Sequence, residues 1–214
     1  MEAATGGQRF VREDATEGRT GAAAATPTIA NPGPLGLAAF ALTTFVLSMF
    51  NAGLVSSAGE PIVFGLAFAY GGLAQVLAGM WEFRTGNTFG ATAFTSYGAF
   101  WLSFWAFVEF FEKDVPKADA GHAVGLYLIA WGIFTAYMTI ASLRTTGAVA
   151  IVFVLLTITF LVLGIGNAGG NTSIVKLGGW LGLATALAAW YASFAEVTNA
   201  TFGRTMMPTW PLQR

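Results

Sequence analysis

The stretch Val149-Ala-Ile-Val-Phe-Val-Leu-Leu156 is apolar at every position. A strand of a membrane barrel would alternate apolar and polar side chains, whereas this stretch is apolar on every side, as is typical of a membrane-spanning helix. It lies inside an uncharged segment that runs from Gly147 to Gly166. At a rise of about 1.5 Å per residue, a helix of that length crosses or nearly crosses a hydrocarbon core of about 30 Å. The segment therefore predicts a transmembrane helix.

Five more segments of similar length contain no Asp, Glu, Lys or Arg: Leu35 to Val55, Ile62 to Trp81, Phe89 to Val108, Ala123 to Leu143 and Leu177 to Ala195. The chain has only 10 basic and 11 acidic residues among 214, and its mean hydropathy is +0.64. A soluble domain usually carries about a quarter charged residues. We predict an all-α integral membrane protein with six transmembrane helices in a domain over residues 31–196. A flexible N-terminal tail, 1–30, and a C-terminal tail, 197–214, flank this domain.

The basic residues are distributed unequally between the two expected faces of the membrane. All seven arginines lie in the tails or in the loops after the second and fourth predicted helices, whereas the three lysines lie on the other face. By the positive-inside rule, this asymmetry predicts that the N- and C-termini are cytoplasmic. We expect a multi-pass protein of the plasma (inner) membrane.

The tripeptide Gly-Asn-Thr occurs twice, at residues 86–88 and 170–172, each time before a predicted helix. Three predicted helices separate the copies, as expected of two inverted three-helix repeats, although a tripeptide in a glycine-rich chain also recurs by chance. Asn and Thr at such positions are typical helix N-caps, and the free N–H groups of a helix N-terminus attract anions. Asn87 and Thr88 are therefore candidate contacts for a carboxylate.

The composition excludes several classes of function. A net charge of -1 with dispersed basic residues provides no footprint for nucleic acid. Without cysteine and with His122 as the single histidine, we expect no metal site and no cofactor. No catalytic aspartate pair, Ser–His dyad or zinc motif can be assembled, so we do not expect an enzyme. Glu82, Glu109 and Glu196 fall at the ends of predicted helices, which argues against a proton pump with a carboxylate in mid-span.

Neutral polar side chains mark the interior of the predicted spans. A primary amide in hydrocarbon needs partners, so Gln75 in the second span must face another helix or a wet cavity. The same argument applies to Thr44 and Asn51 in the first span and to Asn167 at the end of the fifth. Thr92 belongs to a hydroxylated face of the third span, for which close helix packing is the alternative explanation. These side chains are predicted to line a neutral polar route.

Several sequence blocks resemble those of the acetate uptake transporter family. Asn31-Pro-Gly-Pro-Leu-Gly-Leu37 resembles the family signature Asn-Pro-Ala-Pro-Leu-Gly-Leu, from which only Gly33 departs. Further similar blocks follow in order and with matching spacing: Tyr70-Gly-Gly-Leu-Ala-Gln75, Gly86-Asn-Thr-Phe-Gly-Ala-Thr-Ala-Phe-Thr-Ser-Tyr-Gly98, Ala130-Trp-Gly-Ile-Phe134, Gly166-Asn167 and Phe202-Gly-Arg204. The resemblance extends from about Asn31 to Met207.

The resemblance implies a six-helix subunit, a homohexameric ring in the lipid bilayer, and a pathway for acetate and related small carboxylates such as succinate through each subunit. It places a narrow apolar constriction at Phe40, Tyr97 and Leu156. It also matches Asn51 and Gln75 to family positions that bind the carboxylate. Whether such a pathway acts as a channel or as a proton-linked permease stays open.

A tight apolar constriction with polar groups at its mouths suits acetate, a short anion with a methyl group. Because desolvating a bare carboxylate is expensive, we hypothesise that the group crosses either hydrogen-bonded to the Tyr97 hydroxyl or as acetic acid. Two other functions are compatible with the sequence. One is a channel for small neutral solutes such as urea, amides or ammonia, and the other is a membrane scaffold or sensor that carries no flux.

Overall fold

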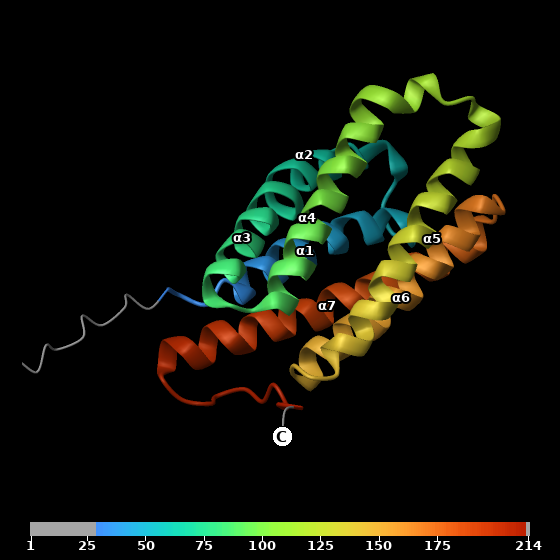
Figure 1. Cartoon of the computed structure of the whole chain (residues 1–214). Coiled ribbons are helices and arrows are strands. Elements are labelled where there is room, and N and C mark those ends of the chain that lie inside the picture. The colour runs from blue at the N-terminus through green and yellow to red at the C-terminus, as the bar shows by residue number, and fades with distance from the viewer. Residues whose placement is uncertain (1–28, 213–214) are drawn as a thin grey trace, which may run out of the picture.

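The computed structural model describes residues 29–212. The predicted N-terminal tail, 1–30, lies almost entirely outside this range. The described chain is a bundle of helices joined by short connections (Figure 1): α1 (Gly33–Asn51), α2 (Ile62–Phe68), α3 (Gln75–Thr85), α4 (Thr88–Ala106), α5 (Lys117–Ser142), α6 (Gly147–Ala168) and α7 (Thr172–Phe202). The predicted all-α class is confirmed for the described residues.

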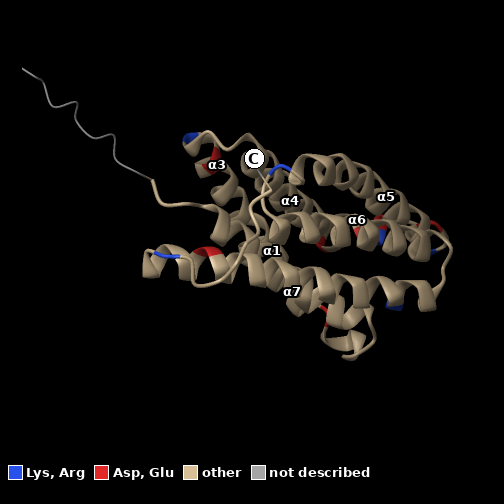
Figure 2. Cartoon of the chain, turned by 90° about the horizontal axis from the view of Figure 1, so that it is seen from below, with Lys and Arg blue, Asp and Glu red and all other residues tan. Residues whose placement is uncertain are grey.

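Five helical stretches are long and apolar enough to cross a membrane: Gly33–Asn51, Ile62–Thr85, Lys117–Ser142, Gly147–Ala168 and Thr172–Phe202. α4 is as long as α1, but its Thr, Ser and Gly residues make it less apolar. Coloured by charge, the chain shows long uncharged helical stretches, with most Asp, Glu, Lys and Arg residues near helix ends (Figure 2). The multi-pass architecture is confirmed, and α4 as a sixth span stays a prediction.

The second long helix, Ile62–Thr85, is interrupted by a π-helical segment at Ala69–Ala74. Two glycines in this segment let the neighbouring helices approach closely, because a Cβ at Gly71 would lie 2.6 Å from Thr43 Oγ1 and one at Gly72 would lie 2.7 Å from Leu102 Cδ2. A π turn changes the direction in which the following side chains point, and such turns are frequent at functional sites. Here it directly precedes Gln75, whose side chain is only 1% exposed.

α7 continues past Ala195, where the uncharged segment ends, as far as Phe202. It stops at Gly203, whose φ of 63° lies in the left-handed region that favours glycine. Glu196 therefore lies well inside α7 rather than at its end, where it was predicted to lie. The prediction ends this helix too early, because a charged residue such as Glu196 at the end of an uncharged segment normally marks the membrane surface.

The segment after α7 folds back against the start of α6. The amide of Gly147 donates to the Trp210 carbonyl at 2.7 Å, and the amide of Ala148 donates to the Thr209 carbonyl at 3.2 Å. These bonds satisfy N–H groups that a helix N-terminus leaves without intrahelical partners. Part of the predicted C-terminal tail is thus fixed against the bundle, where Pro211 reaches a cavity described below.

Both asparagines of the repeated Gly-Asn-Thr are helix N-caps, as predicted. Asn87 Oδ1 accepts from the Gly90 amide at 3.0 Å, and Asn171 Oδ1 accepts from the amides of Ser173 and Ile174 at 3.0 and 3.2 Å. In each helix the side chain replaces a missing intrahelical acceptor. The two copies therefore serve the same local purpose, while an inverted repeat of the whole halves stays a prediction.

Candidate transport pathway

Three cavities follow one another through the described bundle. The terminal vestibule, lined by residues from both ends of the described chain such as Asn31 and Pro211, has a volume of about 380 Å³. The waist, which contains Phe40 and Tyr97, measures only about 20 Å³. The distal vestibule, lined by residues that include Asn51, measures about 400 Å³. A small cavity therefore lies between two wide ones.

α1, α4 and α6 border all three cavities in the same order. Passing from the terminal vestibule through the waist to the distal vestibule, the lining residues are Gly33, Phe40 and Leu47 on α1, Gly90, Tyr97 and Phe104 on α4, and Val149, Leu156 and Leu163 on α6. Each step is seven residues, which is about two helical turns or about 10 Å along the axis. The regular spacing keeps one face of each helix on the same route.

The three residues of the predicted constriction meet at the waist. Phe40, Tyr97 and Leu156 are 5%, 3% and 4% exposed, and the rings of Phe40 and Tyr97 lie 6.0 Å apart between centroids. Gln75, from the start of α3, lines the same small cavity. The structure thus brings together residues from four helices that the sequence analysis associated with the pathway.

The hydrogen bonds at the waist restrict what its polar groups can do. The Tyr97 hydroxyl donates to Thr135 Oγ1 at 3.0 Å, and Thr135 Oγ1 donates in turn to the Trp131 carbonyl at 2.7 Å. The phenolic proton is therefore committed to a protein acceptor. Gln75 Oε1, by contrast, is buried and has no hydrogen-bond partner among the described residues. An unpaired buried carbonyl is costly, and a passing donor would relieve that cost.

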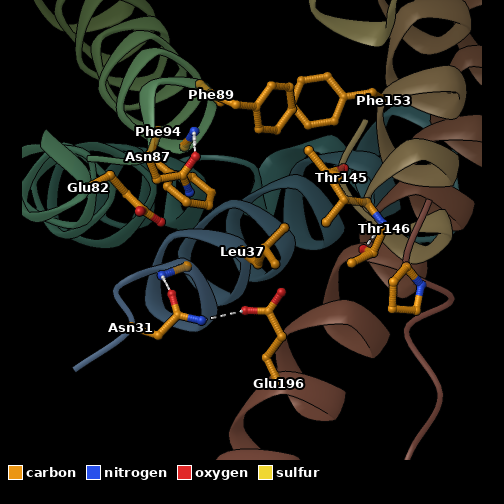
Figure 3. Close-up of a pocket in the computed structure, with 15 residues that line it drawn as sticks. Asn31, Leu37, Glu82, Asn87, Phe89, Phe94, Thr145, Thr146, Phe153 and Glu196 are labelled. Carbon is orange, nitrogen blue, oxygen red and sulfur yellow. Dashed lines mark hydrogen bonds between the residues drawn. The ribbon is translucent and has the colours of Figure 1, made fainter. Parts of the chain in front are cut away.

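Two carboxylates reach the terminal vestibule, Glu82 from α3 and Glu196 from α7 (Figure 3). Glu82 is only 2% exposed, and its Oε2 accepts from Thr85 Oγ1 at 3.0 Å. Glu196 Oε2 accepts from Asn31 Nδ2 at 3.1 Å, while Asn31 Oδ1 accepts from the Gly33 amide. Both acids were expected at helix ends, and neither was predicted as a site residue. A usable signal was the seven-residue spacing of Gln75 and Glu82, which puts both on one helical face.

The distal vestibule also holds two carboxylates, Glu60 and Glu112, together with the predicted pathway residues Asn51 and Asn167. Asn167 Nδ2 donates to the Leu163 carbonyl at 2.8 Å, which leaves its second N–H and its oxygen for a ligand or water. Burial raises the pKa of Glu60, and the nearby negative charge of Glu112 raises it further. Both vestibules thus combine amides with acids.

Because the pKa of Glu60 is raised by folding, the folded protein binds this proton more tightly than the unfolded chain does. The resulting stability is present below the unfolded pKa and is lost as pH rises through the folded pKa. We expect Glu60→Gln to raise the melting temperature in detergent at about pH 7 and to match the wild type at about pH 4. Glu109→Gln, an exposed acid outside the three cavities, serves as the control. An equal difference between Glu60→Gln and wild type at both pH values would contradict this assignment.

Some predicted pathway residues do not reach the cavities. Asn87 lines the terminal vestibule, but Thr88 is exposed and Thr92 is half-buried, and neither lines any of the three. Thr44 is buried and its Oγ1 lacks a partner, yet it also lies outside them. Within residues 29–212, His, Cys, Asp and Glu side chains form no group that could hold a metal ion.

The sequence and the fold are similar to those of known membrane proteins. The chain is 42% identical over 180 residues to the succinate-acetate/proton symporter SatP of Escherichia coli strain K12, which covers 84% of this chain and 95% of that protein. It is 43% identical over 206 residues to ammonia transport outward protein 2 of Saccharomyces cerevisiae, which covers 91% of this chain and 73% of that protein. The solved structure of the bacterial acetate channel SatP matches with a TM-score of 0.80 and 41% identity, covering 85% of this chain and 99% of that one.

The profile of the GPR1/FUN34/yaaH family matches residues 16–214, which is nearly the whole sequence. Together with the identity to SatP over most of both chains, this match assigns the family. The chain belongs to the GPR1/FUN34/yaaH family.

Proposed function

We propose that this protein carries acetate and related small carboxylates such as succinate across the membrane, along the route formed by the terminal vestibule, the waist and the distal vestibule. It is a transporter rather than an enzyme. The observation that carries the proposal is the seven-residue progression of lining residues on α1, α4 and α6, with Phe40, Tyr97 and Leu156 at the narrowest point. Its similarity to the succinate-acetate/proton symporter and to the acetate channel supports the choice of permeant.

The chemistry of the route suits a small monocarboxylate. The vestibules offer amides, such as Asn31, Asn51 and Asn167, that bind a carboxyl group through neutral hydrogen bonds. Neutral partners hold an anion weakly enough to release it, whereas a buried Lys or Arg would retain it. At the waist, the aromatic and aliphatic side chains accept a methyl group and resist hydrated ions. Passage then depends on how the carboxyl group is desolvated.

The proposal also includes the number of membrane spans, the side of the termini and the oligomeric state. Six spans, with α4 as the sixth, place both termini on one side, and the arginine distribution favours the cytoplasm for that side. The terminal vestibule would then open to the cytoplasm and the distal vestibule to the outside of the plasma (inner) membrane. We further propose a homohexameric ring, in which each subunit contains its own route, on the strength of the family resemblance.

The decisive experiment is labelled-acetate uptake by the purified protein in liposomes, compared with protein-free liposomes at short times. We expect uptake above the protein-free rate that unlabelled acetate inhibits. A small neutral solute is the second candidate, because a relative carries ammonia in its name and the waist is uncharged. Ammonium-driven internal alkalinisation without acetate uptake would favour that alternative, and absence of both fluxes would favour a scaffold.

The hydrogen bond from the Tyr97 hydroxyl to Thr135 predicts how transport responds when this hydroxyl is removed. Because this hydroxyl already donates to Thr135, we expect Tyr97→Phe to keep nearly the wild-type rate of acetate uptake while losing about 1 kcal/mol of stability. Uptake and the melting temperature would be measured on the same preparation. A large loss of uptake with an unchanged melting temperature would instead indicate that the hydroxyl binds the permeant carboxyl group directly.

A further inference from the structure

The two acids of the terminal vestibule converge on a single point. A Cβ atom built on Gly33 would lie 3.2 Å from Glu196 Oε2 and 3.5 Å from Glu82 Oε1. Both oxygens therefore border the same small space, on opposite sides of the start of α1 (Figure 3). The two carboxylate oxygens are therefore no further apart than the sum of these two distances, so one water molecule between them can contact both acids.

The described lining of the terminal vestibule provides no positive charge to balance the two acids. Among the described residues that line it there is no Lys, Arg or His, and the hydrogen bonds to the acids come from the neutral groups of Thr85 and Asn31. Within this described lining, a proton is the cation that can neutralise the pair.

The ionisation of Glu82 and Glu196 determines whether an anion can enter the terminal vestibule. A buried carboxylate without a cationic partner is expensive, and two neighbouring carboxylates also repel one another. If both Glu82 and Glu196 were ionised, they would repel an entering acetate as well. One proton held between them removes part of that repulsion and provides a donor for the incoming carboxylate.

An independent observation at the waist also favours the protonated form of the permeant. Gln75 is 1% exposed, its Oε1 has no partner among the described residues, and it lines the cavity that shares Leu37 and Phe153 with the terminal vestibule. A carbonyl oxygen needs a donor, which a carboxylic acid brings and a carboxylate lacks. The Tyr97 proton is already used, so the donor for Gln75 Oε1 comes from the permeant. The second oxygen of a carboxylic acid can accept from the Gln75 side-chain N–H at the same time.

We propose that the Glu82–Glu196 pair is the proton-loading site of the terminal vestibule, and that the permeant crosses the waist as the neutral acid with its O–H donated to Gln75 Oε1. In the loading step, the O–H bond of the glutamic acid breaks and an O–H bond forms on the permeant carboxylate. The glutamate that remains takes up a proton from vestibule water. The transfer exchanges one O–H bond for another between two carboxyl groups, so no further reactant is needed. This inference rests on the proposed transport of carboxylates.

The test compares variants in liposomes, with internal pH, external pH and membrane potential set independently. For the wild type we expect acetate uptake above the protein-free rate that does not change with membrane potential, because a neutral species crosses. Glu82→Gln cannot lend a proton, so we expect uptake to fall at least about tenfold and its pH dependence to flatten. Glu82→Asp, which keeps an acid, should restore part of the rate. Glu109→Gln, an exposed acid outside the cavities, should match the wild type.

The outcomes separate this inference from the proposed function. If the wild type shows no uptake above protein-free liposomes, transport of acetate itself is wrong. If the wild type transports acetate but Glu82→Gln and Glu196→Gln both keep its rate and pH profile, the loading site is wrong while the transport function stands. Uptake by the wild type that rises with a favourable membrane potential would also overturn the inference, because an anion would then be crossing. Should Glu82→Gln fail to fold, Glu82→Asp and Glu196→Gln decide on the same readouts.

Discussion

Replacing Phe40 by alanine is expected to speed the passage of succinate and other carboxylates larger than acetate through the waist. The waist measures only about 20 Å³, and the Phe40 ring forms one of its walls against Tyr97. Removing the ring opens a space that a longer carbon chain can occupy. A reduction of about 1.4 kcal/mol in the barrier corresponds to about a tenfold faster flux, so we expect succinate uptake to rise by at least this factor relative to acetate.

A matched control for this variant exists on the same helix. Phe45 is half-buried on α1 and packs on Trp190 with ring centroids 5.0 Å apart, yet it lines none of the three cavities. Phe45→Ala removes a ring of the same size from the same helix, and because Phe45 is only half-buried, its loss of packing is smaller than the about 3–5 kcal/mol of a Phe in a core. The ratio of succinate to acetate uptake should stay at the wild-type value in this control. The same unchanged ratio in Phe40→Ala would show that the ring does not restrict the route.

The positions of most helices could be predicted from the sequence, because whether a segment spans the membrane depends on its own length and hydropathy. The run Val149–Leu156 is sufficient to identify α6, and the uncharged segment that starts at Ile62 identifies the helix containing Gln75. The constriction at Phe40, Tyr97 and Leu156 came from family resemblance, and composition alone would not have separated these residues from other apolar ones. The structure adds that they share one cavity.

The burial of the two acids in the terminal vestibule was not predicted, for a physical reason. A charged residue at the end of an uncharged segment normally marks the membrane surface, and this rule put Glu82 and Glu196 at helix ends. Their actual depth depends on contacts between helices distant in sequence. Glu82 is covered because α4 approaches α3 so closely that a Cβ on Gly90 would lie 2.7 Å from the Glu82 carboxyl carbon. Such an approach cannot be predicted from the residues around Glu82 alone.

Contacts between helices also explain why the hydroxylated face of α4 does not line the pathway as predicted. Thr92 was predicted to line the pathway because it belongs to a hydroxylated face, but spacing identifies a helical face without saying which neighbour that face meets. In the structure, α4 turns Tyr97 and Gly90 to the cavities, while Thr95 of the hydroxylated face is directed at Gly79 of α3. Close helix packing, the alternative considered for this face, accounts for that contact.

Gly179→Ala is expected to destabilise the bundle severely, because α1 and α7 touch through their backbones at this residue. A Cβ atom on Gly179 would overlap the amide nitrogen of Ala52 and lie 2.6 Å from the carbonyl carbon of Asn51. Backbone atoms cannot turn aside as a flexible side chain can, so the two helices would have to separate. Overpacking of this kind costs about 1–3 kcal/mol and occasionally more, and we expect the upper part of that range.

The displacement should also reach the transport route, since Asn51 lines the distal vestibule and moves with the end of α1. The measurement is the melting temperature of the purified protein in detergent, followed by acetate uptake of the folded fraction. Gly65→Ala is the matched control, because Gly65 is also helical and a Cβ there meets nothing within 4 Å. Alanine is the better helix former, so this control should melt at the wild-type temperature or slightly above it. If Gly179→Ala had the same melting temperature as Gly65→Ala, the close α1–α7 contact would not be what holds these helices together.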